Sequence, residues 1–73
     1  MKFKFFITVN FFLRQATASI CQIIEATDIE DAFECPEGIE LFESLKQIGV
    51  KECDIKVENL TVKESNSLHY MHF

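Results

Sequence analysis

The stretch of sequence that decides the fold is MKFKFFITVNFFL, residues 1–13, in which apolar and polar side chains alternate with a period of two. Every odd position is apolar, whereas the even positions include two lysines, Thr8 and Asn10. This alternation is typical of a half-buried β-strand, because successive side chains of a strand point to opposite faces of the sheet. We therefore expect a long strand over residues 2–13 with its odd side chains in the core.

Two aromatic residues, Phe6 and Phe12, interrupt the polar even face of this expected strand. Either the strand carries a bulge, or this face lies against another chain. We therefore take Phe6 and Phe12 as candidate self-association residues and a homodimer as one expected assembly.

The same N-terminal stretch has some features of a secretory signal peptide, since Lys2 and Lys4 precede an apolar run and Ala16-Thr17-Ala18 fits a cleavage site. The alternation favours the strand, because a signal-peptide helix has no use for a period of two. The run is also too short and too polar to span a bilayer. We expect no membrane partner.

Composition restricts the class of protein. The chain has 73 residues, is 48% hydrophobic and carries a net charge of −5, which predicts one small domain over residues 1–73 and argues against direct binding of nucleic acid. The three cysteines, Cys21, Cys35 and Cys53, form no C-x-x-C pair. They predict reduced, mostly buried thiols in a cytoplasmic protein.

Residues 16–26 fit either a strand or an amphipathic helix. No Gly, Asn or Pro marks a hairpin turn at Arg14-Gln15, which weakens the strand interpretation. We nevertheless favour a strand, because it would end at Ala26, just before a helix-start signal. That signal is a capping box in which Thr27 is the N-cap and Glu30 reaches back.

Pro36 divides the following segment into a short helical turn over 28–34 and a main helix over 36–48. The main helix has an apolar face that includes Leu41 and Leu45. We expect Gly49 to end it in a Schellman motif, with Val50 contacting Leu45.

Beyond this helix, Cys53, Ile55 and Val57 alternate with charged residues and predict a strand. The phase changes at Asn59, which indicates either a bulge or a turn. A turn at 65–67 and a short terminal strand over 68–73 follow. Together these elements predict an α+β fold: a small, mainly antiparallel sheet of three to five strands with one amphipathic helix packed on one face.

Acidic residues recur at every third position in the middle of the chain, and no basic residue lies between Arg14 and Lys46. The seven positions are Glu25, Asp28, Asp31, Glu34, Glu37, Glu40 and Glu43. Because Pro36 breaks the segment, each half spans about 120° of helix surface, and the two halves can present one extended acidic surface. This surface is either a solvated face or a site that binds a positively charged protein.

No motif for catalysis, cofactor binding or metal binding is present. The acidic stretch lacks the D-x-D-x-D-G pattern of a calcium loop, and His69 and His72 form only a bare H-x-x-H pair. We therefore expect no enzymatic activity, no cofactor and no metal. The favoured hypothesis is an inhibitor encoded by a phage or mobile element, whose seven acids mimic nucleic-acid charge and occupy a basic surface of a host protein. The alternative is an assembly module that self-associates through its N-terminal strand.

Overall fold

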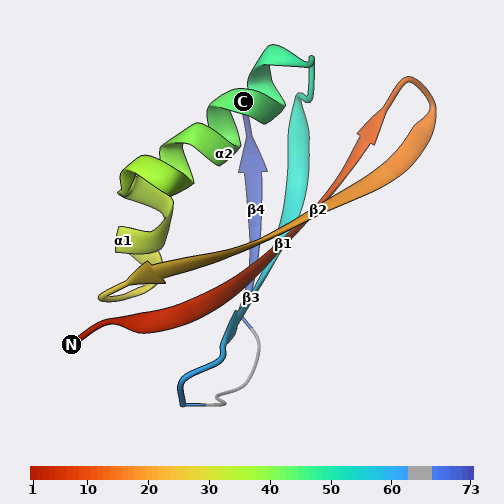
Figure 1. Cartoon of the computed structure of the whole chain (residues 1–73). Coiled ribbons are helices and arrows are strands. Elements are labelled where there is room, and N and C mark those ends of the chain that lie inside the picture. The colour runs from red at the N-terminus through yellow and green to blue at the C-terminus, as the bar shows by residue number, and fades with distance from the viewer. Residues whose placement is uncertain (63–66) are drawn as a thin grey trace.

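Four antiparallel strands form one sheet in the order β2-β1-β3-β4, and two helices cover one of its faces (Figure 1). This computed structural model describes residues 1–62 and 67–73. The elements are β1 (Phe3–Leu13), β2 (Ala16–Ala26), α1 (Ile29–Glu34), α2 (Pro36–Gln47), β3 (Glu52–Asn59) and β4 (Ser67–His72). The arrangement confirms the predicted α+β class.

Strand β1 lies in the middle of the sheet, and its alternation places the odd side chains against the helices. Phe5, Ile7, Val9 and Phe11 are buried. The register between β1 and β2 runs without a break from Phe3 to Leu13, so the strand has no bulge on that side. Burial of these side chains supplies much of the driving force for folding.

Residues 16–26 form a strand, as favoured, and the hairpin turn before it is unusual. Arg14 has φ of 52° and Gln15 has φ of 66°. A two-residue turn with positive φ at both positions matches the right-handed twist of the flanking strands, and Asn-Gly is its usual sequence. Arg and Gln adopt positive φ only at a cost in free energy, so they are uncommon in such turns. The sequence therefore gives no turn signal at this position.

The start of α1 corrects the predicted capping box by one residue. The N-cap is Asp28, whose carboxylate accepts a hydrogen bond from the backbone N–H of Asp31 (2.7 Å). The Asp31 carboxylate accepts reciprocal bonds from the backbone N–H (3.0 Å) and hydroxyl (3.3 Å) of Thr27. Aspartate is a strong N-cap, so Asp28 replaces Thr27 as the N-cap residue. Asp31, three residues later, replaces Glu30 as the side chain that reaches back.

The corner between the helices depends on Gly38, which sequence reasoning did not single out. Gly38 is buried in the first turn of α2. A Cβ atom there would overlap the carbonyl oxygen of Ala32 and lie 2.8 Å from that of Phe33. Only glycine therefore lets α2 begin directly against the end of α1.

The end of α2 confirms the predicted Schellman motif. Gly49 has φ of 101°, and its N–H donates to the Lys46 carbonyl (3.1 Å). The Val50 N–H donates to the Leu45 carbonyl (3.1 Å), and both of these side chains are buried. The two bonds satisfy carbonyls that the helix leaves unpaired.

Of the two alternatives at Asn59, the structure has the turn. The Asn59 side-chain oxygen accepts hydrogen bonds from the backbone N–H groups of Thr61 (3.0 Å) and Val62 (3.2 Å). Such an Asx turn competes with continued pairing and ends β3. The predicted turn at 65–67 lies outside the described residues except for Ser67, which opens β4.

The helical layer covers only part of the inner face of the sheet. Aromatic contacts join the helices to the C-terminal strand region. Phe33 packs edge-on against His69, with ring centroids 5.4 Å apart, and the ring centroids of Phe42 and Phe73 are 6.5 Å apart. Helix α1 contacts the C-terminal end of β2, where Ile24 and Ala26 are buried. The N-terminal half of β2 is exposed, and the β1–β2 hairpin extends away from the helices (Figure 1).

Candidate interaction surfaces

The seven acids expected to form one surface are divided among three settings. Glu25 lies on the outer face of the sheet, because its neighbours Ile24 and Ala26 point inward and are buried. Its cross-strand partner there is Lys4. Asp28 and Asp31 are engaged in capping α1. The structure therefore does not bring these three carboxylates together with the other four. Strand geometry places Glu25 on the outer face of the sheet, and capping bonds hold Asp28 and Asp31 at the start of α1.

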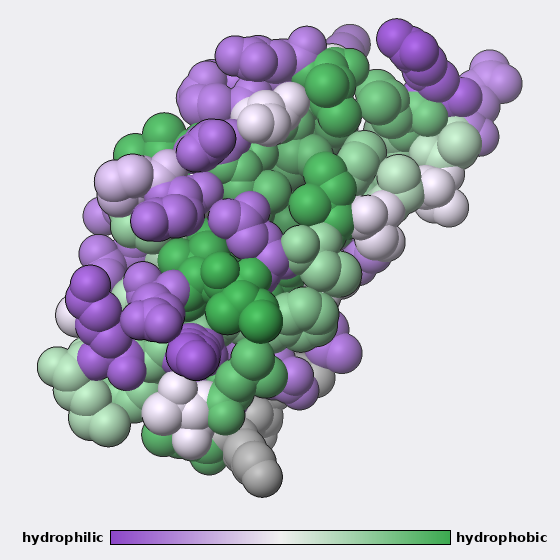
Figure 2. Space-filling model, in the orientation of Figure 1, coloured by the Kyte–Doolittle hydropathy of each residue, from purple (hydrophilic) through white to green (hydrophobic). Residues whose placement is uncertain are grey.

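The other four acids are exposed on the helices, together with Glu30. We call these five residues the acidic helical surface: Glu30, Glu34, Glu37, Glu40 and Glu43. On α2, Glu40 and Glu43 point away from the buried Leu41 and Leu45, and Glu37 lies at the margin. Figure 2 shows hydrophilic side chains gathered over the helical side of the molecule, next to an apolar band.

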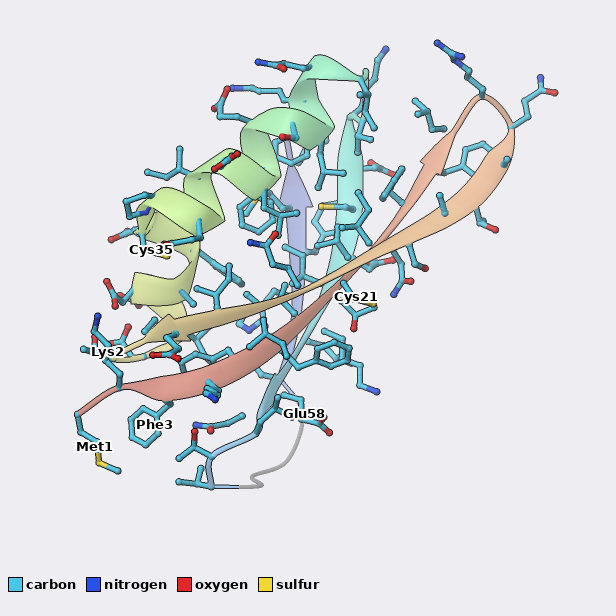
Figure 3. All side chains as sticks on the ribbon, in the orientation of Figure 1. Met1, Lys2, Phe3, Cys21, Cys35 and Glu58 are labelled. Carbon is cyan, nitrogen blue, oxygen red and sulfur yellow. The ribbon has the colours of Figure 1, made fainter. Side chains whose placement is uncertain are left out.

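Few cations neutralise this surface. Among residues 1–62 and 67–73, the single ion pair joins Lys46 Nζ to Glu43 Oε1 (3.8 Å), and both side chains are more than half exposed. An exposed pair of this kind contributes little stability. The pKa of Glu37 is lowered, chiefly by its own backbone N–H and to a smaller extent by the neighbouring Cys35 side chain and the charge of Lys2. Figure 3 shows Lys2 and Cys35 at the same end of the molecule.

The two candidate self-association residues lie on the outer face of β1, where no helix covers them. Phe12 is 61% exposed, whereas Phe6 is half-buried beside Ile23. They are six residues apart, about 20 Å along the strand, and the polar Thr8 and Asn10 lie between them on this face. Because β1 pairs with β2 on one side and β3 on the other, it has no free edge for a second copy. Only its outer face remains available.

A shallow hollow of about 580 Å³ lies on the outer face, near the hairpin end of the sheet. Its polar groups bond to one another: the Tyr70 hydroxyl donates to Glu52 Oε2 (2.6 Å), and Ser19 donates to Asn10 Oδ1 (2.6 Å). The pKa of Tyr70 is raised, chiefly because of its hydrogen bond to Glu52. The hollow offers a concave surface of mixed polar and apolar lining.

The three thiols differ in exposure, and the expectation that they are mostly buried is wrong for Cys21. Cys53 is buried, which raises the pKa of its thiol, and Cys35 is half-buried with its thiol donating to the Ala32 carbonyl (3.4 Å). Cys21 is exposed midway along β2 (Figure 3). Its side chain lies on the outer face of the sheet, like that of Glu25, and the sequence did not reveal this because it left open whether residues 16–26 form a strand.

The two histidines lie on opposite faces of β4, as expected for positions three apart on a strand. His69 faces the helices and is within hydrogen-bond distance of the Ser67 hydroxyl (2.7 Å), while His72 is exposed. In the part of the chain that the structure describes, no three His, Cys, Asp or Glu residues are grouped to hold a metal ion.

The free edge of β2 is a surface that sequence reasoning missed. Strand β2 has 11 residues and, among residues 1–62 and 67–73, pairs only with β1, so no described strand pairs with the other side of its backbone. Its position in the sheet comes from the strand order, which no local pattern encodes. An unpaired edge of this length is a template for a further strand.

Neither the helices nor the comparisons identify the protein. Within the described ranges, no helix is long and apolar enough to cross a membrane. Comparison with protein-family models, curated proteins and solved structures finds no match to this chain. The acidic helical surface and the edge of β2 are the features of the structure that bear on function.

Proposed function

We propose that the chain is a small, non-enzymatic interaction protein that binds a positively charged surface of another protein through the acidic helical surface. The observation that supports this is the exposure of five carboxylates on α1 and α2, with one ion pair among the described residues. The partner is a nucleic-acid-binding protein of a host cell, whose basic surface accepts carboxylates in place of phosphates. In this proposal the chain acts as a cytoplasmic inhibitor encoded by a phage or mobile element.

Electrostatics gives the proposal its physical basis. Like charges three positions apart on a helix destabilise it by a few tenths of a kcal/mol per pair. A cationic partner relieves this repulsion on binding and is attracted over a long range, which raises the association rate at low salt. The lowered pKa of Glu37 keeps that carboxylate charged into mildly acidic solution.

The binding surface in this proposal is smaller than the sequence predicted. Glu25 is excluded because it faces the opposite side of the sheet, and Asp28 and Asp31 are excluded because they cap α1. Glu30 replaces them, since it is exposed on α1 and makes no capping bond among the described residues.

A charge-reversal experiment tests the proposal. In the test variant, Glu37, Glu40 and Glu43 are each changed to Lys; in the matched control, Glu25, Asp54 and Glu58 are each changed to Lys. Both variants shift the net charge equally, but the control residues lie on the outer face of the sheet. Each protein is immobilised, exposed to nuclease-treated bacterial lysate, and washed with salt increasing from about 0.05 M to about 0.3 M.

The original chain and the outer-face control are expected to retain basic nucleic-acid-binding proteins until the salt rises, and the helical variant to retain none. Equal capture by the two variants would contradict the proposal, because net charge and not the helical surface would then explain binding. Capture that resists salt would contradict it as well.

Self-association is a second candidate function, and the bare edge of β2 is the observation that favours it. This edge is separate from the predicted route through Phe6 and Phe12, whose side chains lie on the outer face of β1.

A further inference from the structure

The hydrogen-bond pattern of the sheet identifies which backbone groups of β2 are free. The Leu60 N–H donates to the Lys4 carbonyl, so the even-numbered residues of β1 direct their backbone groups toward β3. In an antiparallel pair, bonded and non-bonded positions alternate, so the odd-numbered residues of β1 bond to β2. Their partners in β2 are the even-numbered residues. The free N–H and C=O groups therefore belong to the odd positions Thr17, Ser19, Cys21, Ile23 and Glu25.

This edge carries none of the features that prevent strand addition. Protected edges are short, bulged, or contain Lys or Pro. Strand β2 is 11 residues long, pairs with β1 in an unbroken register, and has Glu25 as its only charged residue. The other edge of the sheet, β4, has only six residues.

We propose that a second copy of this chain pairs with β2 in antiparallel fashion, so that two four-stranded sheets join into one of eight strands. The symmetry is a two-fold rotation, which makes the interface self-complementary. Complete overlap of two strands spanning residues 16–26 places their midpoint, Cys21, opposite Cys21 of the second copy. In the same register Thr17 lies opposite Glu25 and Ser19 lies opposite Ile23 of the other copy.

Uneven coverage of β2 makes a second copy a good fit. The end of β2 that contains Ile24 and Ala26 is buried beneath α1, whereas Ala16 and Ala18 at the other end are exposed. Antiparallel pairing places the exposed end of each strand beside the covered end of its partner. The helix α1 of the second copy then lies next to the uncovered apolar positions, and the same contact occurs twice.

Charge also permits this assembly in a chain of net charge −5. The acidic helical surface is on α1 and α2, whereas the single acid of β2, Glu25, meets the neutral Thr17 hydroxyl in the proposed register. The edge is about 37 Å long at the usual rise per residue, and each of its five free residues can exchange two hydrogen bonds. The pairing is therefore bonded along its full length with no buried like-charge contact.

Thiol cross-linking tests the register. The protein at about 100 μM is treated with copper phenanthroline, and its mass is measured on non-reducing gels and by sedimentation. A directly opposed pair has Cα atoms about 5.5 Å apart, within the range of a disulfide. We expect rapid formation of a covalent dimer for the original chain, and for Cys21→Ser a non-covalent dimer without this cross-link.

A matched variant moves the thiol along the same face. In Cys21→Ser combined with Ser19→Cys, the two new thiols lie four residues apart along paired strands, about 13 Å, and we expect no rapid cross-link. Cross-linking that is as fast as in the original chain would overturn the proposed register. A monomeric mass for the original chain in sedimentation would overturn the dimer itself.

A proline variant tests the backbone bonds. Cys21→Pro removes an N–H that points to the free edge and leaves the bonds between β1 and β2 intact, which an edge strand tolerates. We expect a monomer with an unchanged far-ultraviolet circular dichroism spectrum. A folded dimer of this variant would contradict edge pairing. If the variant fails to fold, the cross-linking experiment with Cys21 and with the thiol moved to position 19 still tests the pairing.

The Lys substitutions at Glu37, Glu40 and Glu43 should leave the dimer unchanged. The dimer proposal and the charge proposal can therefore be contradicted independently of each other.

Discussion

The acidic helical surface and the edge of β2 differ in the forces that they offer a partner. The helical surface presents five carboxylates on backbone that is already hydrogen-bonded within α1 and α2. The edge presents unpaired backbone groups and a single charged side chain. Binding at the first is expected to weaken with salt, whereas binding at the second depends on hydrogen bonds and persists. One small chain thus has two separable surfaces.

The largest effect is expected from loosening the helical layer that carries the acids. Leu45 is fully buried between α2 and the sheet, so Leu45→Ala should lower the free energy of unfolding by about 2–5 kcal/mol. Urea denaturation followed by circular dichroism measures this change. The control is Ile39→Ala on the same helix, where the side chain is 53% exposed and the loss should be below about 1 kcal/mol. Equal losses would contradict the packing described here.

Gly38→Ala tests the corner that positions the two halves of the acidic helical surface. Helix propensity alone predicts stabilisation by about 1 kcal/mol, but the added Cβ overlaps the Ala32 carbonyl oxygen. We expect a net loss of about 1–3 kcal/mol, measured by urea denaturation. Ser44→Ala, at an exposed position of α2, provides the control and should change stability by less than about 0.5 kcal/mol. Stabilisation by Gly38→Ala would refute the close approach of α1 and α2.

Substitutions in the hairpin turn before β2 are expected to raise the free energy of unfolding, whereas those in the helical layer lower it. Arg14→Asn with Gln15→Gly supplies the residues that tolerate positive φ, and should raise the free energy of unfolding by about 1 kcal/mol. Thermal denaturation reports the change as a higher midpoint. The same pair of substitutions should leave the dimer mass unaltered, because neither residue belongs to the paired part of β2. A lower midpoint would indicate that the turn has another conformation.

These differences follow from what a sequence encodes locally. The alternation in residues 1–13 and the Gly49-Val50 ending of α2 are local patterns, and the structure confirms both. The turn at Arg14-Gln15 gives no signal, because the free energy of pairing β1 with β2 outweighs the local preference of those residues. The shift of the N-cap from Thr27 to Asp28 is a choice between two neighbouring residues that both cap helices well.

The candidate surfaces were predictable to different extents. Exposure of Glu37, Glu40 and Glu43 follows from helical periodicity and the position of Pro36. The placement of Glu25 on the opposite side of the sheet required knowing that residues 16–26 form a strand. The free edge of β2 depends on strand order, which arises from long-range packing and leaves no mark in any short segment.

The smallest expected effect concerns the outer face of the sheet, which belongs to neither surface. Tyr70 is the only tyrosine and the chain has no tryptophan, so absorbance near 295 nm reports its ionisation alone. Its hydrogen bond to Glu52 raises its pKa above the ordinary value of 10.0, and Glu52→Ala should lower the pKa toward that value. Because the folded pKa is the higher one, the stabilisation is present at neutral pH and is lost as the pH rises through the folded pKa. An unchanged titration in Glu52→Ala would exclude the hydrogen bond.

Amide hydrogen exchange along β2, followed by NMR at increasing protein concentration, tests most directly whether the edge is a pairing surface. At low concentration the N–H groups of Ala18, Ile20, Gln22 and Ile24 should be protected by β1, while those of Ser19, Cys21 and Ile23 exchange freely. At high concentration the second set should become protected as well, at low and at high salt alike. Free exchange of Ser19, Cys21 and Ile23 at every concentration, or protection that salt removes, would contradict this account.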